Sequence, residues 1–403
     1  MGLNSLNSDR IICILIFLSF FDRCAEFLYV APSEAFYVLL FLLTTLGFHL
    51  TSIPKYNIFL LWLLIFLCLI TVTALQLLYN LPVNFKYFTG QYLFRIGSVS
   101  YVIALLYKTN NFVNITRFSA YLCLAICLVG AGLIIIYGRI DFFRNVVYQG
   151  RPELAILKLT EAFNPNAISR YLLMMYPLAA YYLLKHVNKT YFLIGTCLIA
   201  IVLISAQSRI GLILFILTSV IFVGKFLKGT KLKYFIILGV SVLIIPTLTG
   251  RLVQKFDQYQ LLETTARLEM YVGALAAIQE KPMLGFGAGN SAEVVHARSN
   301  LSQVYSEASN NKSADKLVVV HSSVLQAIVD FGLLTTALIY IPLLYLIFKN
   351  LRSNTDDFSF ITALSVLMFI LSGLTAANLG SNLGWVMVGL FSASLIRQRK
   401  KYD

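Results

Sequence analysis

The chain has 403 residues, of which 59% are hydrophobic and only 12% are charged, and its formal net charge is +14. Soluble domains are typically about half apolar and about a quarter charged, so this composition excludes an ordinary soluble protein. Apolar runs near the roughly 20 residues of a spanning helix recur from end to end, which predicts an all-α polytopic membrane protein. The sequence contains no nucleic-acid module, and the positive charge fits lysines that orient the chain and meet anionic lipid.

The apolar runs predict about twelve transmembrane helices. Their approximate ranges are 11–31, 35–51, 57–79, 87–107, 118–137, 167–184, 190–206, 209–227, 234–249, 323–348, 359–378 and 383–396. Residues 1–249 hold the first nine helices with an outer loop at about 138–166. Residues 250–322 form one large outer loop, and residues 323–403 hold the last three helices and a basic tail. Because no small-residue cleavage site follows the first apolar run, we interpret that run as a retained helix and not as a signal peptide.

The distribution of basic residues orients these helices. With the N-terminus inside, the short inner connections carry mostly lysine, for example Lys185, Lys225 and Lys349, and the short outer connections carry almost none. This bias follows the positive-inside rule, and it places both termini on the inner side and both long loops outside. Within the large loop, the segment TTARLEMYVGALAAIQEKP has the apolar spacing of an amphipathic helix that Pro282 and the following glycines would end.

Arginine, in contrast, gathers on the outer side. The outer arginines are Arg139, Arg144, Arg151, Arg170, Arg209, Arg251, Arg267 and Arg298. The planar guanidinium fork suits a bidentate grip on phosphate, whereas lysine acts as a point charge. An arginine-rich outer face therefore predicts an anionic ligand there, such as a phosphate-bearing lipid.

Two of these arginines lie in short motifs that allow two interpretations. Arg209, in SAQSRIGLILF, follows a tight outer junction between two spans, where it is either a snorkelling side chain at a helix end or a functional charge at the membrane. Arg267, in ARLEMY, lies near the start of the loop helix. There it forms either a surface salt bridge with a nearby glutamate, worth at most about 1 kcal/mol, or part of an anion site.

The large loop closes with a glycine run and a histidine. The run KPMLGFGAGN alternates glycines at 285, 287 and 289, but no strand precedes it, so we reject a dinucleotide-binding loop. A tight turn after a helix fits best, and a loop whose N–H groups approach an anion is the alternative. His321 precedes two serines and an apolar helix. It is either incidental to a serine helix cap or a general base near neutral pH.

Several kinds of site are absent from the sequence pattern. None of the six cysteines has zinc-site spacing, and no pair of them lies in a soluble loop. The outer segments contain no Asp-x-Asp pair and no His/Cys cluster with metal-ligand spacing. We therefore expect metal-independent chemistry on the outer face, with no cofactor.

Taken together, these residues resemble the O-antigen ligase and polymerase superfamily of bacterial inner-membrane glycosyltransferases. The matching order is Ser208-Arg209-x-Gly211, then Ala266-Arg267-x-x-x-Tyr271, then Pro282-x-x-Gly285-x-Gly287-x-Gly289, then His321 and Asp330-x-Gly332. Spacing and topology match from roughly residue 165 to 348. The family usually has asparagine after this histidine, where the present chain has Ser322, so the partner that orients the ring differs.

The resemblance implies an activity and a set of site residues. The donor would be a glycan on a polyprenyl diphosphate, with His321 taking the proton of the acceptor hydroxyl and Arg209 and Arg267 stabilising the departing diphosphate. The expected substrate-binding residues are Arg139, Arg151, Arg170, Arg251, Gly285 and Gly287. The active site would face the periplasm, with membrane lipids around it and both termini in the cytoplasm.

The resemblance leaves the acceptor open. A polymerase would join repeat units on the lipid carrier, with a chain-length regulator as a candidate partner, whereas a ligase would transfer the finished glycan to the lipid A core. Two observations favour the polymerase. The chain has two long outer loops, and ten residues separate an arginine, Arg139, from a glycine, Gly150. A lipid-linked oligosaccharide flippase is the alternative of another class, but the two halves of the sequence show no internal repeat of the kind common in transporters.

Overall fold

The computed structural model describes the chain in separate stretches. These are residues 8–21, 57–88, 92, 95, 99, 103, 112–137, 165–206, 208–227, 258–301, 320–352, 356–375 and 381–400. The expected spans 35–51 and 234–249 lie outside them, as do nearly all of the outer loop at 138–166 and the polar tract at 302–319. Every secondary-structure element in the described stretches is a helix, which agrees with the predicted all-α class.

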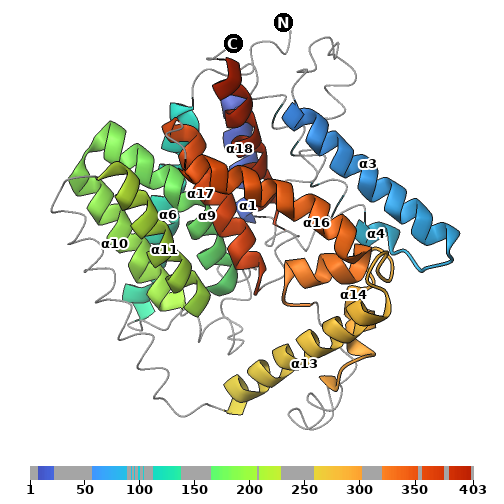
Figure 1. Cartoon of the computed structure of the whole chain (residues 1–403). Coiled ribbons are helices and arrows are strands. Elements are labelled where there is room, and N and C mark those ends of the chain that lie inside the picture. Colours follow the sequence, from blue (N-terminus) through green and yellow to red (C-terminus); the bar gives the residue numbers. More distant parts are fainter. Residues whose placement is uncertain are drawn as a thin grey trace, which may run out of the picture.

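The helices follow one another along the chain as labelled in Figure 1. They are α1 (Ser8–Phe21), α3 (Asn57–Leu78), α4 (Phe85–Phe88), α6 (Val113–Tyr137), α9 (Pro165–Tyr182), the π-helical turn η4 (Leu183–Val187), α10 (Lys189–Ala206), α11 (Arg209–Phe226), α13 (Gln258–Glu280), α14 (Ser291–His296), α16 (Ser323–Arg352), α17 (Asp357–Gly373) and α18 (Asn382–Lys400).

The bundle is built around α9, which packs against α6, α10, α11, α17 and α18. The side chains of α9 from Tyr171 to Ala180 are nearly all buried, and so are those of most of α17. A helix that is apolar all round is expected in the interior of such a bundle. In the same core, Tyr176 packs against Phe215 and Phe222 of α11. This packing holds the second half of α9 against α11.

Four of the described helices are long and apolar enough to cross a membrane. They are Leu60–Leu78, Val113–Ile136, Lys189–Ala206 and Ser323–Arg352, and three shorter apolar helices lie at Ile210–Phe226, Asp357–Gly373 and Asn382–Arg397. Exposed leucines and isoleucines line the outside of the spans, as expected of surfaces that face lipid. These lengths and compositions agree with the predicted membrane protein, whereas the count of twelve spans and their orientation stay predictions.

A charge inside the predicted fourth span has a partner. Arg95 is buried, and its Nε donates a hydrogen bond of 2.9 Å to Oδ1 of Asn382 at the start of α18. A buried charge without such a bond would be costly in an apolar interior, so this contact explains how the span accommodates an arginine.

A second, smaller core lies where α13 and α14 meet the start of α16. It is formed by Ala266, Met270, Ala274, Ala277, Phe286, Val295, Leu301, Val320 and Val329. In Figure 1, α13 and α14 lie at the end of the molecule opposite the two chain termini. The amphipathic helix predicted from TTARLEMYVGALAAIQEKP is confirmed, because α13 covers this stretch and ends at Glu280, two residues before Pro282.

Candidate functional site

His321 lies immediately before α16 and is half-buried. The hydroxyl of Tyr271, on α13, donates a hydrogen bond of 3.5 Å to the backbone carbonyl of His321. The next residue, Ser322, is buried, and its hydroxyl accepts a hydrogen bond of 3.4 Å from the N–H of Leu325. The serine therefore caps α16, as its type and position predicted. Two hydrogen bonds, one at His321 and one at Ser322, thus hold the backbone from which the histidine ring extends.

Arg267 lies one helical turn before Tyr271 on α13 and is also half-buried. Residues four apart on a helix lie on the same face, so the guanidinium and the tyrosine share one side of α13. Because Tyr271 contacts the backbone of His321, this side of α13 faces the start of α16. The ARLEMY motif and the histidine segment, separated by about fifty positions in the sequence, are thus in contact through Tyr271 and the His321 backbone.

Arg209 and Arg170 belong to the N-terminal parts of two neighbouring helices, α11 and α9. Helix α11 begins at Arg209, and its cap is Ser208, whose hydroxyl accepts a hydrogen bond of 3.2 Å from the N–H of Gly211. A side-chain carbon at position 211 would lie 3.0 Å from Cβ of Ser169, so glycine lets α11 approach α9 closely. Arg170 follows Ser169 directly. The side chain of Arg209, and the whole of Arg139, Arg151 and Arg251, lie outside what the structure describes.

The glycine run forms a tight turn that is fitted against other backbone. Gly285, Gly287 and Gly289 have φ values of +67°, +104° and +84°, which other residues rarely adopt. A side-chain carbon at 285 would lie 2.6 Å from the carbonyl oxygen of Val329, and one at 287 would overlap the carbonyl oxygen of Pro82. The interpretation as a tight turn after a helix is confirmed.

The N–H groups of this turn donate within the protein. Those of Phe286 and Gly287 bond to the carbonyls of Val329 and Asp330 at 2.8 and 3.2 Å, and that of Gly285 bonds back to Lys281 at 3.2 Å. These donors are engaged in holding the turn against α16. The structure therefore gives Gly285 and Gly287 a part in the shape of this turn.

The turn rests on a break in α16. Gly332 has φ 83° and ψ 170°, which interrupts the helix one residue after Phe331. Leu333 then donates its N–H to the carbonyl of Pro282 at 2.8 Å. Any side-chain carbon at 332 would overlap the carbonyl of Met283, so the Asp-x-Gly motif contains a glycine that the docking of the turn requires.

Asp330, two residues before the break, is fully buried. Its carboxylate accepts one hydrogen bond of 2.8 Å from the hydroxyl of Tyr92 and one of 3.0 Å from the N–H of Ser291, the first residue of α14. The positive end of a helix dipole favours a carboxylate at this position. Asp330 therefore links α16 to α14 and to the predicted fourth span through hydrogen bonds.

Gln76 of α3 completes this arrangement. Its amide nitrogen donates to the carbonyls of Leu284 and Asp330 at 2.6 and 2.8 Å, and its amide oxygen accepts from the N–H of Ala288 at 3.2 Å. We call Gln76, Tyr92 and Asp330 the polar frame. Asp330 belongs to the motif Asp330-x-Gly332, but the sequence pattern predicted no role for the three side chains of the polar frame. The available signal was a polar residue inside an otherwise apolar span, as at Gln76.

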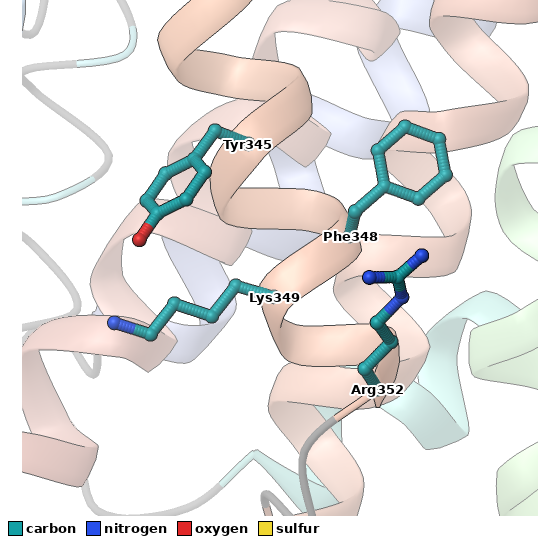
Figure 2. Close-up of a pocket in the computed structure, with 4 residues that line it drawn as sticks. All are labelled: Tyr345, Phe348, Lys349 and Arg352. Atoms are coloured by element: carbon teal, nitrogen blue, oxygen red, sulfur yellow. The ribbon is translucent and has the colours of Figure 1, made fainter.

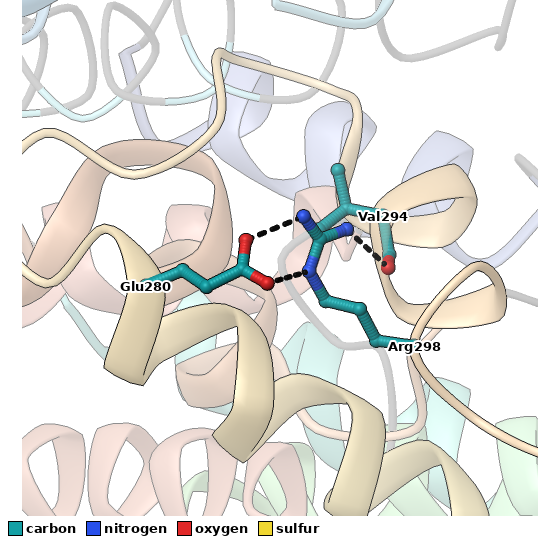
Figure 3. Close-up of polar contacts among 3 residues, drawn as sticks. All are labelled: Glu280, Val294 and Arg298. Atoms are coloured by element: carbon teal, nitrogen blue, oxygen red, sulfur yellow. Dashed lines mark hydrogen bonds and ion pairs between the residues drawn. The ribbon is translucent and has the colours of Figure 1, made fainter.

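One outer arginine has a structural partner. Figure 3 shows Arg298 donating to both carboxylate oxygens of Glu280, at 3.1 and 2.6 Å, and to the carbonyl of Val294 at 3.1 Å. The same guanidinium lies 4.4 Å from the ring centroid of Phe286, and Lys281 Nζ lies 4.8 Å from that centroid. The hydrogen bonds from Arg298 lower the pKa of Glu280. This clamp holds the end of α13 to α14, so Arg298 does not join the arginines that we assign to a ligand.

A surface hollow of about 410 Å³ lies at the other end of α16 from His321. Figure 2 shows its lining residues, Tyr345, Phe348, Lys349 and Arg352, on successive turns of one helix. Aromatic and basic side chains are typical of the end of a membrane span, where they meet the lipid head groups. In the part of the chain that is described, no three His, Cys, Asp or Glu side chains are grouped as metal ligands.

Residues 194–340 match the model of the O-antigen ligase family. The matched region includes Arg209, Arg267, the glycine run, His321 and Asp330, which are the residues that suggested the resemblance. Among curated proteins, none matches the chain.

Proposed function

We propose, from the match of residues 194–340 to the O-antigen ligase family, that this membrane protein is a glycosyltransferase using a glycan on a polyprenyl diphosphate. The observation that carries the proposal is the contact of Tyr271 with the His321 backbone. This contact supports the proposal because it joins the segment that carries His321 to the side of α13 that carries Arg267. A base and a cation close together are what this transfer needs.

The proposed reaction begins with a hydroxyl of the acceptor sugar. Its oxygen attacks the anomeric carbon of the donor glycan, and His321 takes the hydroxyl proton. The bond between the anomeric carbon and the phosphate oxygen breaks, and its electron pair leaves with the polyprenyl diphosphate. The reaction is balanced without a nucleotide, because the diphosphate is itself the leaving group.

In this proposal the arginines bind the charge that develops on the diphosphate. Fixed cations aimed at a developing charge in a water-poor site stabilise a transition state more than they would in water. Arg267 would act from α13 and Arg209 from the start of α11, with Arg170 beside it on α9. Arg139, Arg151 and Arg251 would extend the grip on the donor. The N-terminal ends of α9 and α11 add the positive ends of two helix dipoles.

The polar frame would support the site without touching the substrate. Asp330 and Gln76 hold the glycine turn, and the turn follows directly on α13. A small displacement of catalytic groups can lower a rate by two orders of magnitude. We therefore assign Gly285 and Gly287 to the alignment of α13 with α16.

We further propose that the acceptor is a lipid-linked glycan, so that the protein polymerises O-antigen or another surface polysaccharide at the periplasmic face of a bacterial inner membrane. A chain-length regulator is a candidate partner for that activity. The second candidate is transfer to the lipid A core, which is favoured by the description of the matched family as an O-antigen ligase.

Reconstitution separates these activities. The purified protein is placed in phospholipid vesicles with lipid-linked repeat units as the only substrate. Longer lipid-linked chains identify a polymerase, whereas product that forms only after lipid A core is added identifies a ligase. Movement of the lipid-linked glycan across the bilayer without a new bond would contradict the proposal and identify a flippase.

A further inference from the structure

Helix α13 is apolar on two opposite sides. One side carries Ala266, Met270 and Ala274, which are buried against α14 and α16. On the other side, Leu268, Val272 and Leu275 are 59%, 55% and 55% exposed. Spacings of four and three residues place these side chains in one stripe along the helix.

This exposed stripe is not what a water-facing helix presents. A helix on the surface of a soluble unit has charged and polar residues on its outer face. Among the side chains of α13 that the structure describes, from Ala266 onward, the exposed positions of this stripe are Leu268, Val272, Leu275 and Gln279, and none of them carries a charge. Its neighbour α14 differs, because Glu293 is exposed there. Helices α13 and α14 thus differ in their exposed surfaces: that of α13 carries the apolar stripe, and that of α14 carries a charged residue.

The stripe continues towards a surface that already faces lipid. On the candidate span α16, Leu333, Leu334 and Leu338 are exposed large apolar residues. Met283, which is 60% exposed, follows the end of α13. It is adjacent to α16 because the N–H of Leu333 donates to the carbonyl of Pro282 at 2.8 Å. Met283 therefore lies between the two exposed apolar surfaces.

We propose that α13 is an in-plane membrane helix, whose apolar stripe of Leu268, Val272 and Leu275 lies, together with Met283 after its end, in the phospholipid leaflet that the N-terminal half of α16 enters. Helices of this kind lie roughly 5–10 Å deep, at the boundary between head groups and acyl chains.

The proposal gives the stripe a role in the reaction, and this step rests on the proposed function. Arg267 is the neighbour of Leu268 in the sequence, and Tyr271 precedes Val272. If the stripe is immersed, both residues are held near the level of the head groups. The diphosphate of a lipid-linked donor lies at that same level, so α13 would hold its cation at the depth of the leaving group.

Fluorescence quenching tests the immersion independently of any activity. The six native cysteines are replaced, single cysteines are introduced as Val272→Cys and Leu275→Cys, and a polarity-sensitive nitrobenzoxadiazole label is attached. The protein is studied in phosphatidylethanolamine and phosphatidylglycerol vesicles. Quenchers are lipids with a nitroxide near the carboxyl end or near the middle of the acyl chain, and aqueous iodide. Leu268→Cys provides a further position if a labelled variant fails to fold.

Two matched positions calibrate the measurement. A variant that keeps only Cys197, which is exposed on the candidate span α10, gives the signal of lipid. Glu293→Cys on α14 gives the signal of water. We expect stripe positions to lose most of their emission to the lipid nitroxides, more to the shallow one, and little to iodide. Iodide quenching equal to that at position 293 would overturn the proposal. Protection from all quenchers would also overturn it, because protein would then cover the stripe.

Discussion

Replacing Gly285 by alanine tests whether the glycine turn is a structural part of the site. The backbone there has φ +67°, and a left-handed conformation costs a residue with a side chain about 1–2 kcal/mol. The new carbon would lie 2.6 Å from the carbonyl oxygen of Val329 and 2.8 Å from the carbonyl carbon and oxygen of Asp330. These are backbone atoms of α16, so the overlap cannot be relieved by a rotating side chain, and overpacking of this kind adds about 1–3 kcal/mol.

The expected loss in the free energy of unfolding is therefore about 2–5 kcal/mol. Titration of the detergent-purified protein with SDS in mixed micelles would measure it. The matched control is Gly224→Ala on α11, where a side-chain carbon meets no other heavy atom within 4 Å. Alanine in a helix interior is roughly 0.5–1 kcal/mol better than glycine, so the control should keep or gain stability. A Gly285→Ala protein that unfolds like the control but makes no product would refute the reasoning, because the glycine would then act on the substrate.

Three further substitutions test neighbouring contacts. Asp330→Asn removes one of the two carboxylate acceptors while keeping the size of the side chain. It should cost about 1–3 kcal/mol, the penalty of a buried donor left without a partner, and equal stability of the two proteins would contradict the role of Asp330 in the polar frame. Ser322→Ala removes the cap of α16 and should cost about 0.5–2 kcal/mol, whereas an unchanged melting temperature would show that the cap contributes nothing. The Glu280–Arg298 pair predicts a pH dependence. The pKa of Glu280 in the folded protein is lowered from the ordinary value of 4.5. The ion pair therefore contributes to the free energy of unfolding above that value, and the contribution is lost as the pH falls through the folded pKa. Acidification from pH 7 should lower the melting temperature of the native protein more than that of Glu280→Gln, and identical acid profiles would contradict the clamp.

Local signals in the sequence were sufficient for most of the described helices. The segment predicted at 209–227 is observed as Arg209–Phe226, because Ser208 is a cap that the residue type reveals. The loop helix was predicted from apolar spacing and from Pro282, and α13 ends as that pattern requires. Helix α6 begins at Val113, earlier than the predicted 118, because its first turn is polar and a hydropathy pattern does not detect it.

Contacts between distant segments could not be predicted in this way. Gln76 bonds to the turn and to α16 across more than two hundred residues, and no spacing in the sequence pairs these segments. The break at Gly332 was also missed, because a glycine inside an apolar run is compatible with a continuous helix. Its positive φ and the close approach of the Met283 carbonyl are features of the folded backbone. The predicted roles of Arg267 and His321 also require two distant segments to lie close together. That expectation came from the resemblance to a family and not from a local pattern.

The central claim is that His321 takes the proton in glycan transfer, and the vesicle reaction with lipid-linked donor tests it most directly. The measurement compares initial rates of product formation by the native protein, by His321→Ala and by His296→Ala, a histidine of the same small unit at the end of α14. General-base catalysis contributes typically 10²–10⁴-fold. The account predicts that His321→Ala loses at least about a hundredfold in rate while remaining folded and membrane-inserted, and that His296→Ala keeps most of the native rate. Native product formation by His321→Ala would contradict it.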